Sequence, residues 1–223
     1  PPLLETPAAI AAMAFILVGL SLKVALFPLH LWLPNAYAFA PTVTTAFIAA
    51  TATKVSIYLL MRFLYSVFGF SFSAEMTPIP ELILILSTLA IFVGSLTAIF
   101  QENVKRMLAY SSVAQIGYIT LGIAIANATG LTGSLVHIFN HAVMKGALFM
   151  LVGGIALQIG TVRISDMAGI GKLMPLTMFG FVIGGLSMLG VPGTVGFVSK
   201  WYLAVGALEN GWWWLVVLLM LNI

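Results

Sequence analysis

Long apolar runs separated by short polar connections divide the chain into helical segments. Each run exceeds the roughly 10 residues of a membrane β-strand, and most approach the roughly 20 residues that a helix needs to cross the hydrocarbon layer. Hydropathy therefore predicts about seven spanning helices in an all-α, polytopic transmembrane bundle. They are expected at residues 7–29, 42–68, 79–100, 107–126, 131–159, 175–208 and 212 to the end.

Two of these segments contain residues that interrupt a helix. The breaks are expected at Pro28, His30 and Pro34, where the first segment ends, and at Gly190, Pro192 and Gly193 within the sixth. A broken helix is tolerated at membrane depth only where its freed carbonyls line a cavity or are buried in protein. An ordinary proline kink is the alternative for the second break. Lys200 follows that break by about two turns, which favours a functional interruption.

The composition supports an integral membrane protein and narrows its chemistry. Hydrophobic residues make up 61% of the chain and charged residues only 7%. In a soluble domain, roughly a quarter of all residues are charged. The net charge of +3 comes without a basic cluster and does not indicate nucleic-acid binding. Because cysteine is absent, disulfides, thiolate-held iron–sulfur clusters and c-type haem attachment are not expected.

The connections between segments predict an orientation. Positive residues follow the third and fifth segments, whereas only Arg62 marks the other side. The positive-inside rule therefore places the connections after the first, third and fifth segments in the cytoplasm, so the chain would enter the membrane from outside. These positive residues are Lys105, Arg106, Arg163 and Lys172. The sequence has no readable signal peptide and its last apolar run is about half a span, so we expect an internal piece of a longer polypeptide.

Three lysines, Lys23, Lys54 and Lys145, lie within apolar segments. An ammonium group in hydrocarbon costs several kcal/mol, so each is a functional-site hypothesis. The alternative is a lysine paired with a carboxylate from another helix purely to hold the fold. The carboxylates of the chain all fall at helix ends or in loops, so a partner must come from elsewhere. They are Glu5, Glu75, Glu81, Glu102, Asp166 and Glu209.

His137, His141 and Lys145 form the sharpest helical pattern, with Ser134 one turn earlier. Their i, i+4, i+8 spacing places them on one face over roughly 12 Å of membrane depth. Histidine titrates near neutrality and a desolvated lysine can release its proton, so the line predicts a stepwise proton relay. Alternatively, each histidine bonds a backbone carbonyl and Lys145 extends to the interface. Three titratable groups on one face favour the relay.

Other kinds of site are disfavoured. Two histidines without a third ligand make a poor zinc site, and adjacent turns of one helix cannot place them on opposite sides of a haem. Gly171-Lys172 lacks the strand and glycine spacing of a phosphate loop. Asn127-Ala-Thr129 fits a glycosylation acceptor, but so short a pattern is common by chance. We therefore expect no catalytic residue, metal or bound cofactor.

Three stretches resemble the antiporter-like subunits of respiratory complex I and of multisubunit Na⁺/H⁺ antiporters. They are KVALFPLHLWLPNA from Lys23 to Ala36, NVKRMLAYSSVAQIGY from Asn103 to Tyr118, and GVPGTVGFVSK from Gly190 to Lys200. The likeness also includes Lys54 and the His137–Lys145 line, and it extends over nearly the whole chain in the correct order.

The resemblance implies a larger subunit of about fourteen helices built from two inverted repeats, each with one broken helix. Residues 1–223 would be a partial proton-conducting domain, similar to helices seven to thirteen. A glutamate upstream of this chain would pair with Lys23. The implied proton-relay residues are Lys23, Lys54, Lys105, His137, His141, Lys145 and Lys200.

Our main functional expectation is the D-type membrane subunit of a multisubunit Na⁺/H⁺ antiporter, acting in proton translocation. The sequences PNAY at residues 34–37 and GFVSKW at residues 196–201 resemble that group more closely. The alternative is a proton-pumping subunit of NADH:quinone oxidoreductase or of a membrane-bound hydrogenase. A stand-alone solute carrier is disfavoured, since the polar groups form titratable lines rather than a pocket. Expected partners are other membrane subunits, protons and Na⁺, in a bacterial inner membrane.

Overall fold

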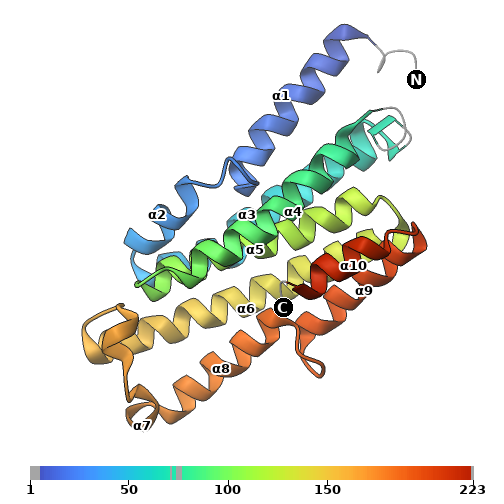
Figure 1. The fold of residues 1–223 in the computed structure, drawn as a ribbon. Coiled ribbons are helices and arrows are strands. Elements are labelled where there is room, and N and C mark those ends of the chain that lie inside the picture. Colours follow the sequence, from blue (N-terminus) through green and yellow to red (C-terminus); the bar gives the residue numbers. More distant parts are fainter. Residues whose placement is uncertain (1–5, 71, 74–76, 222–223) are drawn as a thin grey trace.

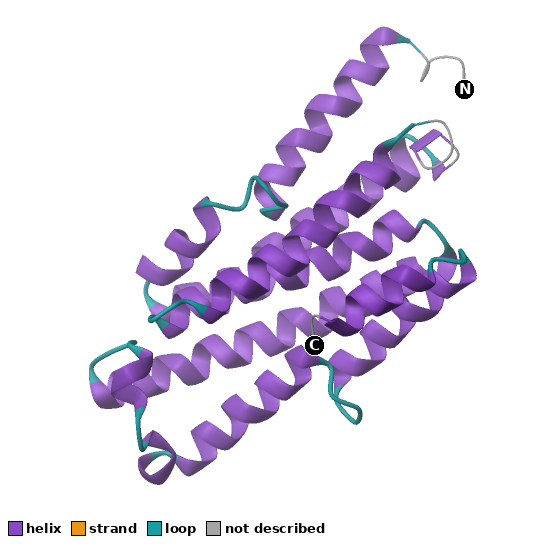
Figure 2. Ribbon diagram, in the orientation of Figure 1, coloured by secondary structure: helices purple, strands orange, loops and turns teal. Residues whose placement is uncertain are grey.

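The computed structural model describes residues 6–70, 72–73 and 77–221, and this part is a helical bundle without strands (Figures 1 and 2). The all-α, polytopic prediction is confirmed. A π-helical turn, Phe63–Val67, continues α3, and a 3₁₀ turn, Ile164–Met167, follows α6. The helices are α1 Pro7–Val24, α2 Trp32–Phe39, α3 Thr42–Arg62, α4 Ile79–Ile99, α5 Val104–Ile125, α6 Ala128–Ile159, α7 Ile170–Leu173, α8 Pro175–Leu189, α9 Val195–Glu209 and α10 Trp213–Leu221.

Helix α5 forms the centre of the bundle. In its apolar window 89% of the residues are buried, against 11% in α1, and α5 packs against α2, α4, α6 and α9. Within the described ranges, five helices are long and apolar enough to cross a membrane, namely α1, α3 with its π-helical extension, α4, α5 and α6. Helix α8 is apolar but shorter, because it is one half of an interrupted span.

Two asparagine caps start α5 and α6 about one turn earlier than hydropathy predicts. The Asn103 side chain accepts hydrogen bonds from the backbone N–H groups of Lys105 and Arg106, and Asn127 accepts one from Gly130. Such capping satisfies donors that a helix start leaves free. Lys105 therefore lies in the first turn of α5 and not in the loop that the sequence suggests.

The first break occupies the residues between α1 and α2. Helix α1 ends at Val24 because Ala25 adopts a left-handed conformation with φ of 61°. Pro28 and the buried His30 lie within the break. Pro34, which the sequence pattern assigns to the break, lies instead in the first turn of α2. A proline is tolerated there because the first N–H groups of a helix have no intrahelical acceptor.

The second break separates α8 from α9 and forms a loop that projects from the bundle in Figure 1. Gly190 and Gly193 have φ values of 87° and 91°, a region that glycine enters without the strain of a side chain. Pro192 lies between them. Beyond the loop, Gly196 comes so close to α8 that a Cβ atom built on it would lie 1.7 Å from the Ser187 carbonyl oxygen.

Candidate functional site

Five basic side chains from three helices lie in the interior of the bundle. Lys54 comes from α3, His137, His141 and Lys145 come from α6, and Lys200 comes from α9. The three residues of α6 are fully buried, and none of the five is more than 8% exposed. Helix α6 packs against α3 on one flank and α9 on another. We call these five residues the buried basic line.

Lys145 is held by neutral acceptors on α5. Its Nζ donates to the Leu108 carbonyl at 2.6 Å and lies 2.5 Å from the Ser111 hydroxyl. Lys54 donates to the Ala49 carbonyl of its own helix. Lys145 therefore does not extend to an interface. A lysine bonded to neutral acceptors keeps its hydrogen bonds whether its nitrogen carries two or three protons.

The carboxylates of the described residues lie away from this line. Each is exposed at a helix end or in a connection, so none of these described carboxylates is a counter-ion of the buried bases. A buried charge without a counter-ion is costly. The exposed carboxylates are Glu81, Glu102, Asp166 and Glu209.

His137 bridges α5 and α9. Its Nε2 lies 2.8 Å from Gln115 Oε1, and its Nδ1 lies 2.7 Å from Ser199 Oγ. The Gln115 amide nitrogen donates to the Met188 carbonyl, which leaves Oε1 as an acceptor and assigns the Nε2 hydrogen to His137. Ser199 can donate to Nδ1 or to the Gly196 carbonyl at 3.1 Å. The hydroxyl thus accommodates both the neutral and the charged imidazole.

His141 lies one turn from His137 and one turn from Lys145 on α6. The two imidazole rings stack with centroids 6.1 Å apart. Both ring nitrogens of His141 are buried without a hydrogen-bond partner in the part of the chain that the structure describes. A proton arriving at this ring therefore displaces no existing hydrogen bond of the protein.

Lys200 joins the line to the second break. Its Nζ donates to the Leu189 carbonyl at 2.8 Å, at the end of α8, and lies 4.3 Å from the centroid of the Tyr118 ring. The same ring is 6.0 Å from that of His137. Gly190 permits the approach, because a Cβ atom there would lie 2.8 Å from Lys200 Cδ. A freed carbonyl of the broken helix thus holds a base of the line.

Lys23 lies apart from the line. It is exposed in the last turn of α1, beside a cavity of about 360 Å³ that Trp32, Ala52 and Ser56 also line. Lys54 lies two residues from both Ala52 and Ser56, about 200° around the helix, so its side chain points away from this cavity. The predicted carboxylate partner of Lys23 lies outside this chain and stays a prediction.

Lys105 is buried in the first turn of α5, and its Nζ donates to the Ala40 carbonyl at 2.6 Å. Leu108, the partner of Lys145, follows one turn later on the same helix. The two lysines therefore contact α5 at neighbouring turns.

Sequence reasoning missed the neutral residues that hold the basic ones. Ser111, Gln115 and Tyr118 come from one face of α5, and Ser199 precedes Lys200 on α9. The i, i+4, i+7 spacing of the three α5 residues was a usable signal. This face of α5 lies against the face of α6 that carries His137 and Lys145.

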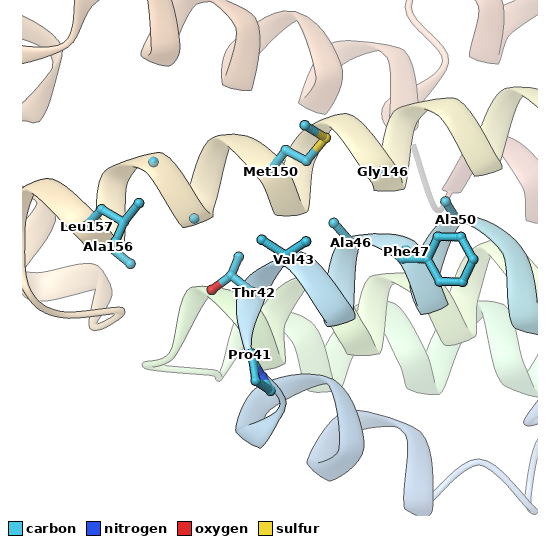
Figure 3. Close-up of a pocket in the computed structure, with 12 residues that line it drawn as sticks. Pro41, Thr42, Val43, Ala46, Phe47, Ala50, Gly146, Met150, Ala156 and Leu157 are labelled. Carbon is cyan, nitrogen blue, oxygen red and sulfur yellow. The ribbon is translucent and has the colours of Figure 1, made fainter.

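An apolar groove of about 650 Å³ lies between α3 and α6 (Figure 3). Ala46, Phe47 and Ala50 line it from α3, and Gly146 and Met150 line it from α6. None of its lining residues is ionisable, whereas small-molecule sites place a few polar groups to orient the ligand. The groove gives no support to a stand-alone solute carrier.

Together, the two interrupted helices and the buried basic line define a polytopic helical membrane bundle with titratable groups in its interior. The sequence matches the family described as NADH:quinone oxidoreductase/Mrp antiporter, TM, over residues 3–223. The chain belongs to this family, as the resemblance of its motifs predicts.

Similar proteins occur in both redox complexes and antiporters. NADH-quinone oxidoreductase subunit N of Desulforudis audaxviator (strain MP104C) is 48% identical over the whole chain. The archaeal membrane-bound sulfane sulfur reductase is 34% identical over 96% of the chain, with a TM-score of 0.88 and 43% of that chain covered. The Mrp complex of Dietzia sp. DQ12-45-1b is 29% identical over 98%, with a TM-score of 0.87 and 41% covered.

The chain spans 44% of the length of the Desulforudis relative. That relative favours the redox alternative over our main expectation of a D-type antiporter component, because the Mrp structure is less similar in sequence.

Proposed function

We propose that this chain is part of a proton-pumping membrane subunit of a respiratory redox complex of the NADH:quinone oxidoreductase type. The observation that carries the proposal is the buried basic line, whose five titratable side chains come from α3, α6 and α9 and lie in the interior of one bundle. Its three lysines and His137 make hydrogen bonds to neutral groups, and His141 makes none in the described part of the chain. The 48% identity to a subunit N supports redox-driven pumping in particular.

In the proposed path, a proton passes from Lys54 to Lys145 and then along His141 and His137 to Lys200. A charge change at Lys23, driven by a carboxylate elsewhere in the subunit, would alter the proton affinity of Lys54. The five groups of the buried basic line come from packed helices, so a proton on one would affect its neighbours, and we propose that their protonation is coupled. We propose that other membrane subunits complete the complex, in a bacterial inner membrane.

A second candidate is a Na⁺/H⁺ antiporter subunit. The TM-score of 0.87 to the Mrp complex supports it, and the buried basic line suits either machine. What differs is the driving force. A redox reaction would drive proton pumping in the first case, whereas the second exchanges Na⁺ for protons across the membrane.

The test of the proposed function uses everted vesicles from cells that carry the intact complex and no other proton-pumping NADH dehydrogenase. We expect NADH oxidation to acidify the vesicle interior and so to quench the fluorescence of an acridine dye. We expect this quenching to be lost in Lys54→Ala. We expect Na⁺ to leave unchanged a pH gradient that a different pump has set up. Collapse of that gradient on Na⁺ addition, lost in Lys54→Ala and without NADH-driven quenching, would establish the antiporter instead.

Ser199→Ala is expected to slow proton translocation about tenfold, because the alanine gives His137 Nδ1 neither a donor nor an acceptor at 2.7 Å. Ser199→Thr restores the hydroxyl and should keep most of the rate. Initial dye-quenching rates, normalised to the amount of assembled complex, measure both. Equal rates in the alanine variant and the wild type would remove Ser199 from the path.

A further inference from the structure

Lys105 lies at the N-terminal end of α5, where its positive charge is unfavourable for the helix dipole. It follows the capping residue Asn103 in the first turn of α5, and its side chain is only 5% exposed. The N-terminal end of a helix carries partial positive charge, so a cation there is unfavourable. The stability of α5 therefore gives no reason for a buried lysine at this position.

The ammonium group of Lys105 lies instead at the C-terminal end of α2, where a cation is favourable. Its Nζ is 2.6 Å from the carbonyl oxygen of Ala40, the residue that caps α2. Pro41 follows and has no N–H to continue the helix. The Tyr37 carbonyl, which residue 41 would have satisfied, accepts from the Thr45 hydroxyl at 3.0 Å.

Two side chains thus satisfy the carbonyls at this corner. Thr45 comes from the adjoining α3 and is 3.3 Å from the Ala40 oxygen. Lys105 comes from 65 residues away and makes the shorter bond. Of these two side chains, Lys105 is the one that comes from α5. A second contact between the first break and α5 is the edge-on approach of the His30 and Tyr110 rings, with centroids 6.5 Å apart.

We propose that Lys105 is a positioning residue that fixes the end of α2 to α5, and that it does not itself pass protons. The inference rests on the proposed function. Leu108 and Ser111, which hold Lys145, follow Lys105 on α5 within two turns. Fixing α2 against this part of α5 keeps the second half of the first broken helix in register with the buried basic line.

The test compares Lys105→Arg with Lys105→Met in the complete complex, with Lys172→Ala as control because Lys172 is exposed. Arginine keeps the charge and the donors but does not release its proton. Methionine keeps much of the stem and removes the donors. The two measurements are proton translocation in everted vesicles and amide hydrogen exchange of the segment from Trp32 to Ala40.

We expect the arginine variant to retain at least half of the wild-type rate, with normal exchange. In the methionine variant, we expect the backbone amide hydrogens of α2 to exchange about tenfold faster and proton translocation to be about tenfold slower. The positioning role is also supported if the methionine variant fails to assemble while the arginine variant assembles and translocates protons. An arginine variant as inactive as the methionine variant, with α2 protected in both, would make Lys105 a relay residue and overturn the proposal.

Unchanged exchange in the methionine variant would also overturn it. A wild-type complex that translocates no protons would refute the proposed function alone. In that case the exchange of α2 in the methionine variant still decides whether Lys105 fixes α2 to α5.

Discussion

Proton translocation is expected to fall about 10²-fold or more in Lys145→Ala, the magnitude typical of removing a group that transfers protons. Lys145 is fully buried and lies between His141 on its own helix and the Leu108 carbonyl of α5. Alanine removes the only titratable group of α6 that contacts α5 near Ser111. The proposed path would then lack the base that follows Lys54.

Lys145→Met separates this loss from a packing defect, because methionine fills much of the space of the lysine stem. Both variants should assemble to a measurable extent and both should fail to pump. Lys172→Ala is the matched control, since Lys172 is exposed in α7. Initial dye-quenching rates in everted vesicles, divided by the amount of complex on a native gel, provide the comparison. Wild-type rates in an assembled methionine variant would exclude Lys145 from the path.

The helices could be predicted from the sequence because the bilayer imposes their length and composition. Apolar runs of about 20 residues leave few alternatives to spanning helices. Helix starts were predicted less well. Hydropathy averages over a window and does not register the Asn103 and Asn127 side chains, which bind backbone N–H groups and add polar residues to the first turns of α5 and α6.

The residues of the buried basic line were also predictable, since each is a base within an apolar run and three of them share a helical face. Their partners were not assigned. Which neutral side chain meets His137 depends on how α5 and α9 pack around α6, and spacing within one helix does not reveal the neighbour that it faces. Lys23 shows the same limit. An apolar context predicted burial, but in the described part of the chain Lys23 lies on the outer surface of α1.

The largest structural effect is expected from Gly196→Ala. A Cβ atom at residue 196 would lie 1.7 Å from the Ser187 carbonyl oxygen and 2.9 Å from the Ser187 carbonyl carbon. Backbone atoms cannot rotate aside as a flexible side chain does, so α8 and α9 must separate at the break. Overpacking of this kind costs about 3 kcal/mol or more. The separation would also weaken the bonds from Lys200 to the Leu189 carbonyl and from Ser199 to His137.

Gly185→Ala is the control, because Gly185 lies on α8 and a Cβ atom there meets nothing within 4 Å. Alanine also favours a helix more than glycine does, by about 1 kcal/mol, so the control should be as stable as the wild type or slightly more stable. The thermal midpoint of the purified complex, followed by tryptophan fluorescence, measures both variants. A Gly196→Ala complex with the midpoint and the pumping rate of the control would show that the close approach of the two half-helices is not required. A lowered midpoint together with lost pumping would show that the second break must stay tightly packed for Lys200 to reach the buried basic line.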